Sequence, residues 1–168
     1  MADALTAFDT AVAVHLVGHV GTFGELAREL ATSSSQVHKA VRHLTVAGLL
    51  LPGTRSVNRS ALLEFLVHGV KYAFPVQVGA PTRGVRTAHS GPALAGHFDD
   101  IDPIVWAAPD GEAVGREIEP LYPGAIHLRE RAPDTYRLLT LIDAIRMGRA
   151  RERNLAVEEL ERVLVRAV

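Results

Sequence analysis

The sequence predicts an α+β protein in which an N-terminal helical region precedes a smaller module of strands and helices. Apolar residues recur every three or four positions over the first 70 residues and again after residue 133. Between these stretches, short β-prone runs alternate with turn-forming residues. We therefore expect two domains, an N-terminal one over residues 1–70 and a small α+β module over residues 71–168 that ends in two helices.

The spacing of apolar residues predicts three helices before residue 50. The first covers residues 4–20 and ends at Gly21. Thr22 and Glu25 then form a capping-box pattern, in which each side chain binds a backbone amide of the other, at the start of a second helix over residues 23–31. A tract of Thr and Ser residues breaks the chain and caps a third helix, which Gly48 closes. The expected buried faces comprise Leu5, Phe8, Val12, Leu16 and Val20 in the first helix, Phe23, Leu26, Ala27 and Leu30 in the second, and Val37, Val41 and Leu44 in the third.

The outward face of the third helix carries hydrogen-bonding and basic side chains. When a helix lies in the major groove, Gln pairs with adenine, and Arg or Lys pairs with guanine. The sequence therefore predicts that this helix contacts DNA. The expected contact residues are Ser34, Ser35, Gln36, His38, Lys39, Arg42 and His43.

Residues 49–59 form two short extended pieces around Pro52 and Gly53, a pattern typical of a small wing. Arg55 is expected at its tip and Arg59 at its base, where each would contact a phosphate or the minor groove. The alternative is that both arginines are solvated surface residues.

The stretch TFGELARELATSSSQVHKAVRHLTVAGLL, residues 22–50, resembles the winged helix-turn-helix of bacterial transcription regulators such as the MarR and ArsR groups. The resemblance covers about residues 20–60 and implies DNA binding. Two short amphipathic helices that never touch DNA are the competing interpretation. The pattern depends on Leu26, Ala27, Leu30, Ser35, Val37, Val41, Leu44, Gly48 and Leu49.

Charge is distributed unevenly along the chain, although the net charge is only -1. Residues 30–98 hold seven lysines and arginines against one acid, Glu64, for a net charge of +6. A block of positive charge is the usual electrostatic footprint of a polyanion site, because neutralised phosphates release condensed counterions. Chance clustering is the alternative.

After the expected wing, Ser60 would cap a fourth helix that ends at Gly69. Residues 72–78 are β-prone, and residues 79–89 are rich in turn formers, which indicates a strand followed by a loop. In that loop, Arg83, Arg86 and His89 would make a secondary contact with DNA or an anion, or line an effector pocket. A solvated loop packed on the core is the other possibility.

Asp110 and Gly111, between residues 103–106 and 113–118, predict a β-hairpin with a type I′ turn. A helix from Pro133 and a last helix over residues 151–165 are joined around Gly148. Apolar surface on these helices and on the first helix makes them candidates for a dimer interface. Four arginines in this region either contact a phosphate or a partner, or lie at helix ends because positive charge there is favourable for the helix dipole and for solubility. They are Arg146, Arg149, Arg151 and Arg153.

The chain lacks the usual signatures of catalysis. Cysteine is absent, and there is no P-loop, no GxGxxG and no nucleophile elbow around Ser90. His15 and His19 have the i, i+4 spacing of metal ligands, but no third ligand is evident from the sequence. We expect no enzyme activity, no cofactor and no metal. A second candidate group of metal ligands is interpreted instead as helix-capping and solvated residues. It contains His89, His97, Asp99, Asp100 and Asp102.

The sequence thus predicts a cytoplasmic, sequence-specific DNA-binding transcriptional regulator, acting as a dimeric repressor on double-stranded DNA. No apolar run reaches the roughly 18 residues that span a bilayer. The alternative is an antitoxin-type or adaptor protein that regulates its own gene through the winged helix and binds a partner protein through its C-terminal module. A small effector is a further possible ligand.

Overall fold

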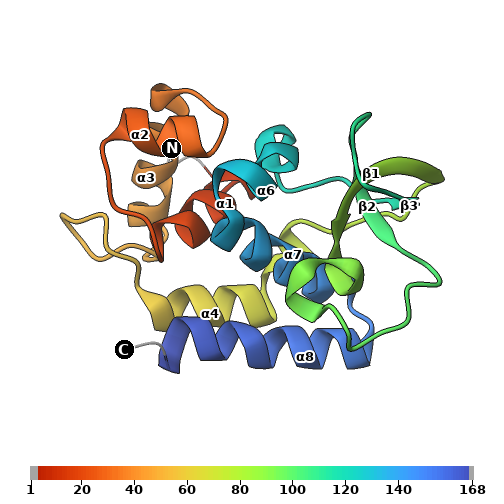
Figure 1. Cartoon of the computed structure of the whole chain (residues 1–168). Coiled ribbons are helices and arrows are strands. Elements are labelled where there is room, and N and C mark those ends of the chain that lie inside the picture. Colours follow the sequence, from red (N-terminus) through yellow and green to blue (C-terminus); the bar gives the residue numbers. More distant parts are fainter. Residues whose placement is uncertain (1–3, 167–168) are drawn as a thin grey trace.

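The computed structural model of the chain describes residues 4–166 and has an α+β architecture (Figure 1). N-terminal helices precede a three-stranded mixed sheet, and further helices follow it. This confirms the predicted fold class at that level. The α-helices are α1 (Ala7–Leu16), α2 (Phe23–Glu29), α3 (Ser34–Val46), α4 (Arg59–His68), α5 (Val70–Ala73), α6 (Leu128–Arg131), α7 (Pro133–Met147) and α8 (Ala150–Glu161). The strands are β1 (Pro81–Thr87), β2 (Ile104–Ala107) and β3 (Ala113–Glu117).

Capping residues determine where the first helices begin. The predicted capping box of α2 is confirmed, since Glu25 N donates to Thr22 Oγ1 at 3.1 Å and Thr22 N donates to Glu25 Oε2 at 2.7 Å. A second capping box, Thr6 with Asp9, begins α1 later than the sequence predicted. The helix also ends earlier, at Leu16, so Val20 lies outside it and is 99% exposed instead of buried.

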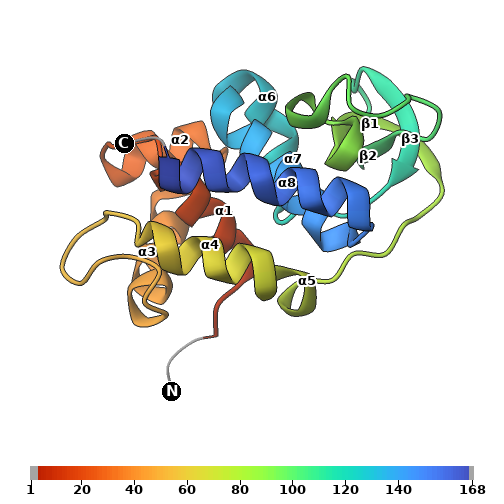
Figure 2. The ribbon, with the colours of Figure 1, turned by 90° about the horizontal axis from the view of Figure 1, so that it is seen from below.

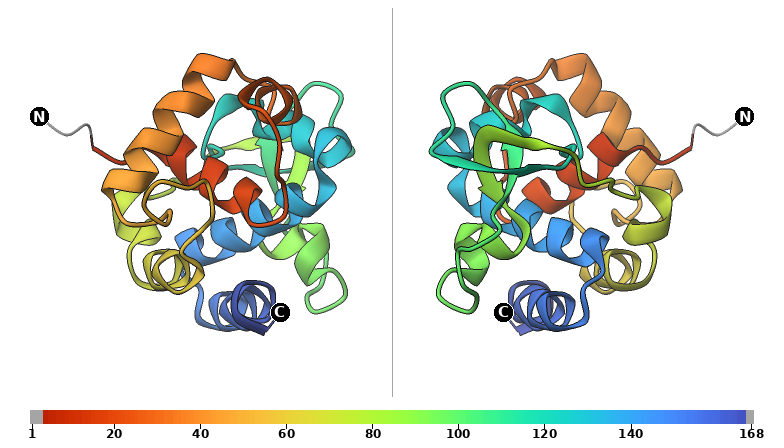
Figure 3. Two further views of the ribbon diagram at one scale, coloured as in Figure 1. Left: turned by 90° about the vertical axis from the view of Figure 1, so that its left-hand side faces the viewer. Right: turned by 90° about the vertical axis from the view of Figure 1, so that its right-hand side faces the viewer.

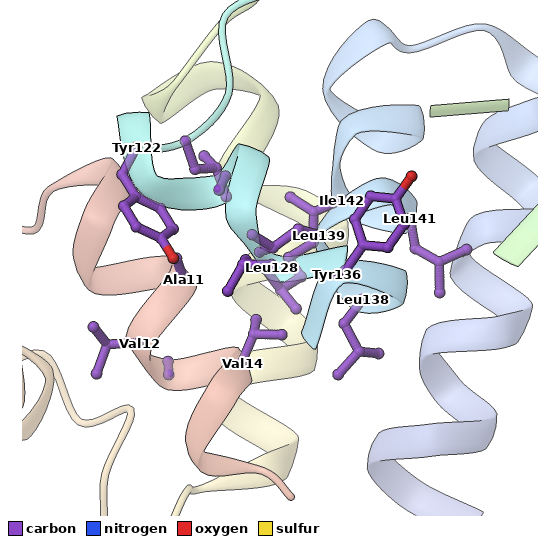
Figure 4. Packing of buried hydrophobic residues seen from close by; sticks show 14 of the residues in the cluster. Ala11, Val12, Val14, Tyr122, Leu128, Tyr136, Leu138, Leu139, Leu141 and Ile142 are labelled. Atoms are coloured by element: carbon purple, nitrogen blue, oxygen red, sulfur yellow. The ribbon is translucent and has the colours of Figure 1, made fainter. Parts of the chain in front are cut away.

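Helix α1 lies at the centre of the hydrophobic core, between α3 and α7 (Figure 1). Its residues from Asp9 to Leu16 are all buried, so that every face of the helix is covered. Figure 4 shows Val14 of α1 on the side of that helix that faces Leu138 of α7, whereas Val12 lies on the opposite side. Because α1 and α7 cover each other, the apolar surface that the sequence assigned to a dimer interface is largely buried within one chain. Residues on both sides of position 70 share this core.

The sheet forms from a segment that the sequence interpreted differently. The predicted loop over residues 79–89 is wrong, because Pro81–Thr87 is strand β1, which pairs antiparallel with both β2 and β3. The predicted strand over residues 72–78 is also wrong, since helix α5 occupies residues 70–73 and no strand follows before residue 81. Proline at the first position of β1 is compatible with this strand, because no ladder hydrogen bond is lost there.

The predicted hairpin between β2 and β3 is wrong as well. The two strands pair in parallel, and neither Asp110 nor Gly111 has the positive φ that a type I′ turn requires. Instead, the connection passes closely over β1, so that a Cβ atom on Gly111 would lie 2.2 Å from the backbone of Gly84. A Cβ atom on Gly84 would in turn lie 2.0 Å from the carbonyl oxygen of Trp106. These glycines allow three strands to close on each other.

The C-terminal helices follow the prediction. Gly148, with φ of 73°, ends α7 in the left-handed conformation and connects it to α8. Helix α4 lies beside α8 (Figure 2). The cap of α4 differs from the prediction, since Asn58 accepts the hydrogen bond from Ala61 N at 3.3 Å and Ser60 already lies inside the helix.

Candidate nucleic-acid interface

Helix α3 runs along the outside of the molecule (Figure 3, left). Ser33 caps it by accepting a hydrogen bond from Gln36 N at 3.3 Å. Its inner face packs on α1 and α2 through Val37, Ala40 and Leu44, all of which are buried. The helix is therefore anchored along one side and leaves the other side accessible.

The accessible side of α3 carries most of the side chains that the sequence assigned to DNA. The helix contains two cations, Lys39 and Arg42, and no acid. His38 also makes an edge-to-face contact with the ring of Phe23 in α2, at 5.1 Å between ring centroids. Six of the predicted contact residues are exposed here: Ser34, Ser35, Gln36, His38, Lys39 and Arg42.

His43 is a correction to the predicted outward face. Its side chain is 5% exposed, and its Nδ1 lies 2.8 Å from Asp9 Oδ2 in α1. The sequence placed Val41 in the buried stripe, but Val41 is half-buried whereas the smaller Ala40 is fully buried. The buried face is therefore centred closer to Ala40, and His43, three residues further along, turns inward with it. Its ring stabilises the contact of α3 with α1 and is not accessible to DNA.

Residues 49–58 form a short antiparallel turn beside α2. A single bridge joins Leu50 to Val57, and Gly53 has φ of 70°. Arg55, predicted at the tip, is exposed but folds back on α2: its Nη1 donates to the Gly21 carbonyl at 2.6 Å, and its guanidinium lies 5.0 Å from the Phe23 ring centroid.

Arg59 is half-buried at the first position of α4. Its guanidinium donates to the carbonyl oxygens of Val17 at 3.3 Å and Val163 at 3.2 Å. These bonds connect the ends of three segments that are distant in sequence. Arg59 thus follows the turn directly, at its predicted place, but backbone carbonyls already use its donors.

The expected cluster of Arg83, Arg86 and His89 does not assemble into one site. Arg86 forms a bidentate ion pair with Asp100, and this guanidinium holds the pKa of Asp100 below its usual range. Arg83 donates to the Gly111 carbonyl at 3.1 Å. His89 is buried, and its Nε2 lies 3.1 Å from the Asp102 carbonyl oxygen. Local partners therefore occupy all three side chains.

The four arginines from Arg146 to Arg153 are also engaged within the chain. Arg146 is buried and pairs with Asp143 at 2.7 Å, and Arg153 donates to the Val67 carbonyl at 3.1 Å. Arg149 lies 3.8 Å from Glu152, and Arg151 stacks over the ring of Phe98 at 5.1 Å. These contacts favour the interpretation that the four arginines stabilise the fold over the one in which they contact a phosphate or a partner.

Sequence reasoning missed a basic pocket beside the turn that precedes α3. Arg28, His127 and Arg131 are among the residues that line this pocket of about 530 Å³. Arg131 Nη1 donates to the Arg28 carbonyl at 2.7 Å and thereby joins α6 to the end of α2. No local pattern indicated this cluster, because its members lie about 100 residues apart.

A second cluster lies at the C-terminal ends of α1 and α2. His15 Nε2 lies 2.7 Å from Glu29 Oε2, and His19 Nδ1 lies 3.5 Å from the same oxygen. The two imidazole rings stack with centroids 4.0 Å apart. Burial, and then the charge of a protonated His19, lower the pKa of His15. The sequence identified both histidines but not Glu29.

The other candidate group of metal ligands, around His89, His97 and Asp99, does not come together as a ligand set. Asp100 and Asp102 pair instead with Arg86 and Arg116.

Within residues 4–166, no helix is long and apolar enough to cross a membrane. Comparisons of the chain with models of known protein families, with curated protein sequences and with solved structures found no match.

Proposed function

We propose that the protein is a sequence-specific DNA-binding transcriptional regulator in which α2, α3 and the turn over residues 49–58 act as a winged helix-turn-helix. The single observation that supports this most is the exposed face of α3. It combines Gln36, Lys39 and Arg42 with no acid on the same helix. These side-chain types form the bidentate contacts with adenine and guanine in the major groove.

The surroundings of α3 support the same function. The helix is anchored by buried residues on its opposite side, so its exposed face keeps a fixed direction relative to the rest of the fold. Arg28 and Arg131 lie beside the turn that leads into it. Basic side chains next to a base-reading helix position the protein on the duplex through phosphate contacts, without contributing sequence information.

A repressor that reads a palindrome acts as a dimer, with half-sites about 34 to 36 Å apart. The apolar faces of α1 and α7 are covered within the chain, so a dimer would use another surface. We therefore propose a homodimer that forms through a surface other than these faces. Sedimentation of the chain with and without DNA would test it.

The direct experiment measures binding of the full chain to the duplex upstream of its own gene and to a scrambled duplex of equal length, at two salt concentrations. We expect tighter binding to the upstream duplex and a strong loss of affinity at the higher salt concentration. Equal, weak binding to both duplexes would contradict the proposal. It would also contradict the antitoxin alternative, which binds the same upstream duplex through its winged helix.

Two variants separate base contacts from phosphate contacts. Arg42→Ala should weaken binding to the upstream duplex by about 1 to 3 kcal/mol and relax specificity if Arg42 reads a base. Arg131→Ala should weaken binding to both duplexes alike and reduce the salt slope by about 1 if Arg131 contacts a phosphate. The matched control is Arg151→Ala in the first turn of α8. The start of this helix lies at the end of the molecule away from α3 (Figure 1), so the variant should bind DNA like the wild type.

A further inference from the structure

We infer that His15, His19 and Glu29 form a binding site for a divalent transition-metal ion such as Zn²⁺. Among residues 4–166, these three form the one group in which three potential ligand atoms lie within 4.8 Å of one another. Two imidazole nitrogens and one carboxylate oxygen are a common protein ligand set for zinc, in which the fourth position is left to water or another ligand.

Two of the three separations are close to those of a tetrahedral ion, but the ring of His19, stacked at 15° to that of His15, must rotate for its lone pair to reach the ion. Zinc bonds of about 2.0 to 2.1 Å to nitrogen and oxygen place neighbouring ligand atoms about 3.3 Å apart in a tetrahedron. The present separations from Glu29 Oε2 are 2.7 Å to His15 Nε2 and 3.5 Å to His19 Nδ1, on either side of that value. Glu29 is 36% exposed and His19 is 26% exposed, so their side chains have room to adjust.

A buried partner orients the most enclosed ligand. His15 is fully buried, and its Nδ1 lies 2.7 Å from Thr135 Oγ1 at the start of α7. When Nδ1 carries the proton and donates it to Thr135, Nε2 presents its lone pair toward Glu29. Metal-bound histidines almost always have such an outer partner, which fixes the tautomer and the ring orientation.

The site also has an approach from solvent. His19 borders a pocket of about 490 Å³ that Arg55 and Arg59 also line, and a second pocket of about 250 Å³ that includes Thr135. The ligands come from the C-terminal ends of α1 and α2, so a bound ion would connect these helices to each other and, through Thr135, to α7. Binding therefore stabilises the folded state over the unfolded one by mass action.

The test titrates the full chain, freed of metal by a chelator and dialysed, with ZnCl₂ in a calorimeter. We expect one Zn²⁺ per chain and a higher melting temperature. His19→Ala and Glu29→Gln each remove a ligand without opening the core and should abolish this binding. Thr135→Val should weaken it by about 10- to 100-fold, as loss of an outer partner does. The control His97→Ala changes an exposed histidine outside the cluster and should bind like the wild type.

Two further probes identify the ion's surroundings. Co²⁺ should give the intense visible absorption of a tetrahedral site in the wild type and lose it in His19→Ala. Mg²⁺ should cause no melting shift, because it prefers an all-oxygen octahedral shell. The inference is overturned if Zn²⁺ does not bind, or if His19→Ala and Glu29→Gln bind it as tightly as the wild type. None of these readouts involves DNA, so their failure is independent of the proposed function.

Discussion

Among residues 4–166, the histidine–carboxylate pairs His43–Asp9 and His15–Glu29 have nearly equal lengths but different surroundings. His43 and Asp9 lie 2.8 Å apart and are 5% and 3% exposed, so the pair is closed off from solvent. His15 and Glu29 lie 2.7 Å apart, but Glu29 is 36% exposed and a second imidazole stacks on the first. The same interaction therefore serves two purposes. The closed pair joins α1 to α3, whereas the open pair is available to a ligand.

The largest expected effect comes from breaking the closed pair. His43→Ala leaves the buried Asp9 carboxylate without its imidazole partner and should lower the free energy of unfolding by about 3 kcal/mol. Urea denaturation measured by circular dichroism gives this value. A loss below about 1 kcal/mol would show that the pair contributes no more than a surface contact does.

A smaller change in the free energy of unfolding should come from the open pair, His15 and Glu29, when the pH changes. Burial and His19 lower the pKa of His15 in the folded state, so the unfolded chain takes up this proton at a higher pH than the folded chain. The contribution of His15 to stability is therefore complete above about pH 6.5, the usual histidine pKa, and is lost as the pH falls below it.

This loss should be reduced in His19→Ala, because the charge of His19 is one of the causes of the lowered pKa. Urea denaturation of both proteins at about pH 7 and pH 5, with chelator present, provides the measurement. An equal or steeper loss in His19→Ala would contradict the assigned cause.

The smallest effect is expected from Glu29→Gln in the presence of chelator. Glu29 is partly exposed, and the amide of Gln can still form a hydrogen bond with the His15 imidazole, so the melting temperature should change little. The matched comparison is Asp9→Asn in the closed pair, which should lower the melting temperature clearly. Equal destabilisation by the two variants would remove the distinction between the pairs.

Local signals account for most of what the sequence predicted correctly. The Thr22–Glu25 capping box and Gly148 after α7 each act within a few residues, so both could be identified without tertiary information. The exposed face of α3 followed from helical periodicity, except at His43, where the inward turn depends on the close approach of α1.

The features that the sequence did not predict depend on contacts between distant segments. The pairing of β2 and β3 with β1 requires Gly84 and Gly111 to meet, and their separation in sequence gives no indication of this. Glu29 joins His15 and His19 only because α2 folds back beside the end of α1. The two carbonyl partners of Arg59, Val17 and Val163, are likewise distant in sequence and gave no local signal.

The most direct test of the central claim locates α3 on the DNA. The chain has no cysteine, so Ser34→Cys and Asn154→Cys each provide one thiol for a DNA-cleaving iron chelate, at the start of α3 and in α8 respectively. We predict sequence-specific cleavage of the upstream duplex by the label at position 34 and none by the label at position 154. Cleavage from position 154 alone, or from neither position while the labelled protein binds the duplex, would show that α3 is not the DNA-binding face.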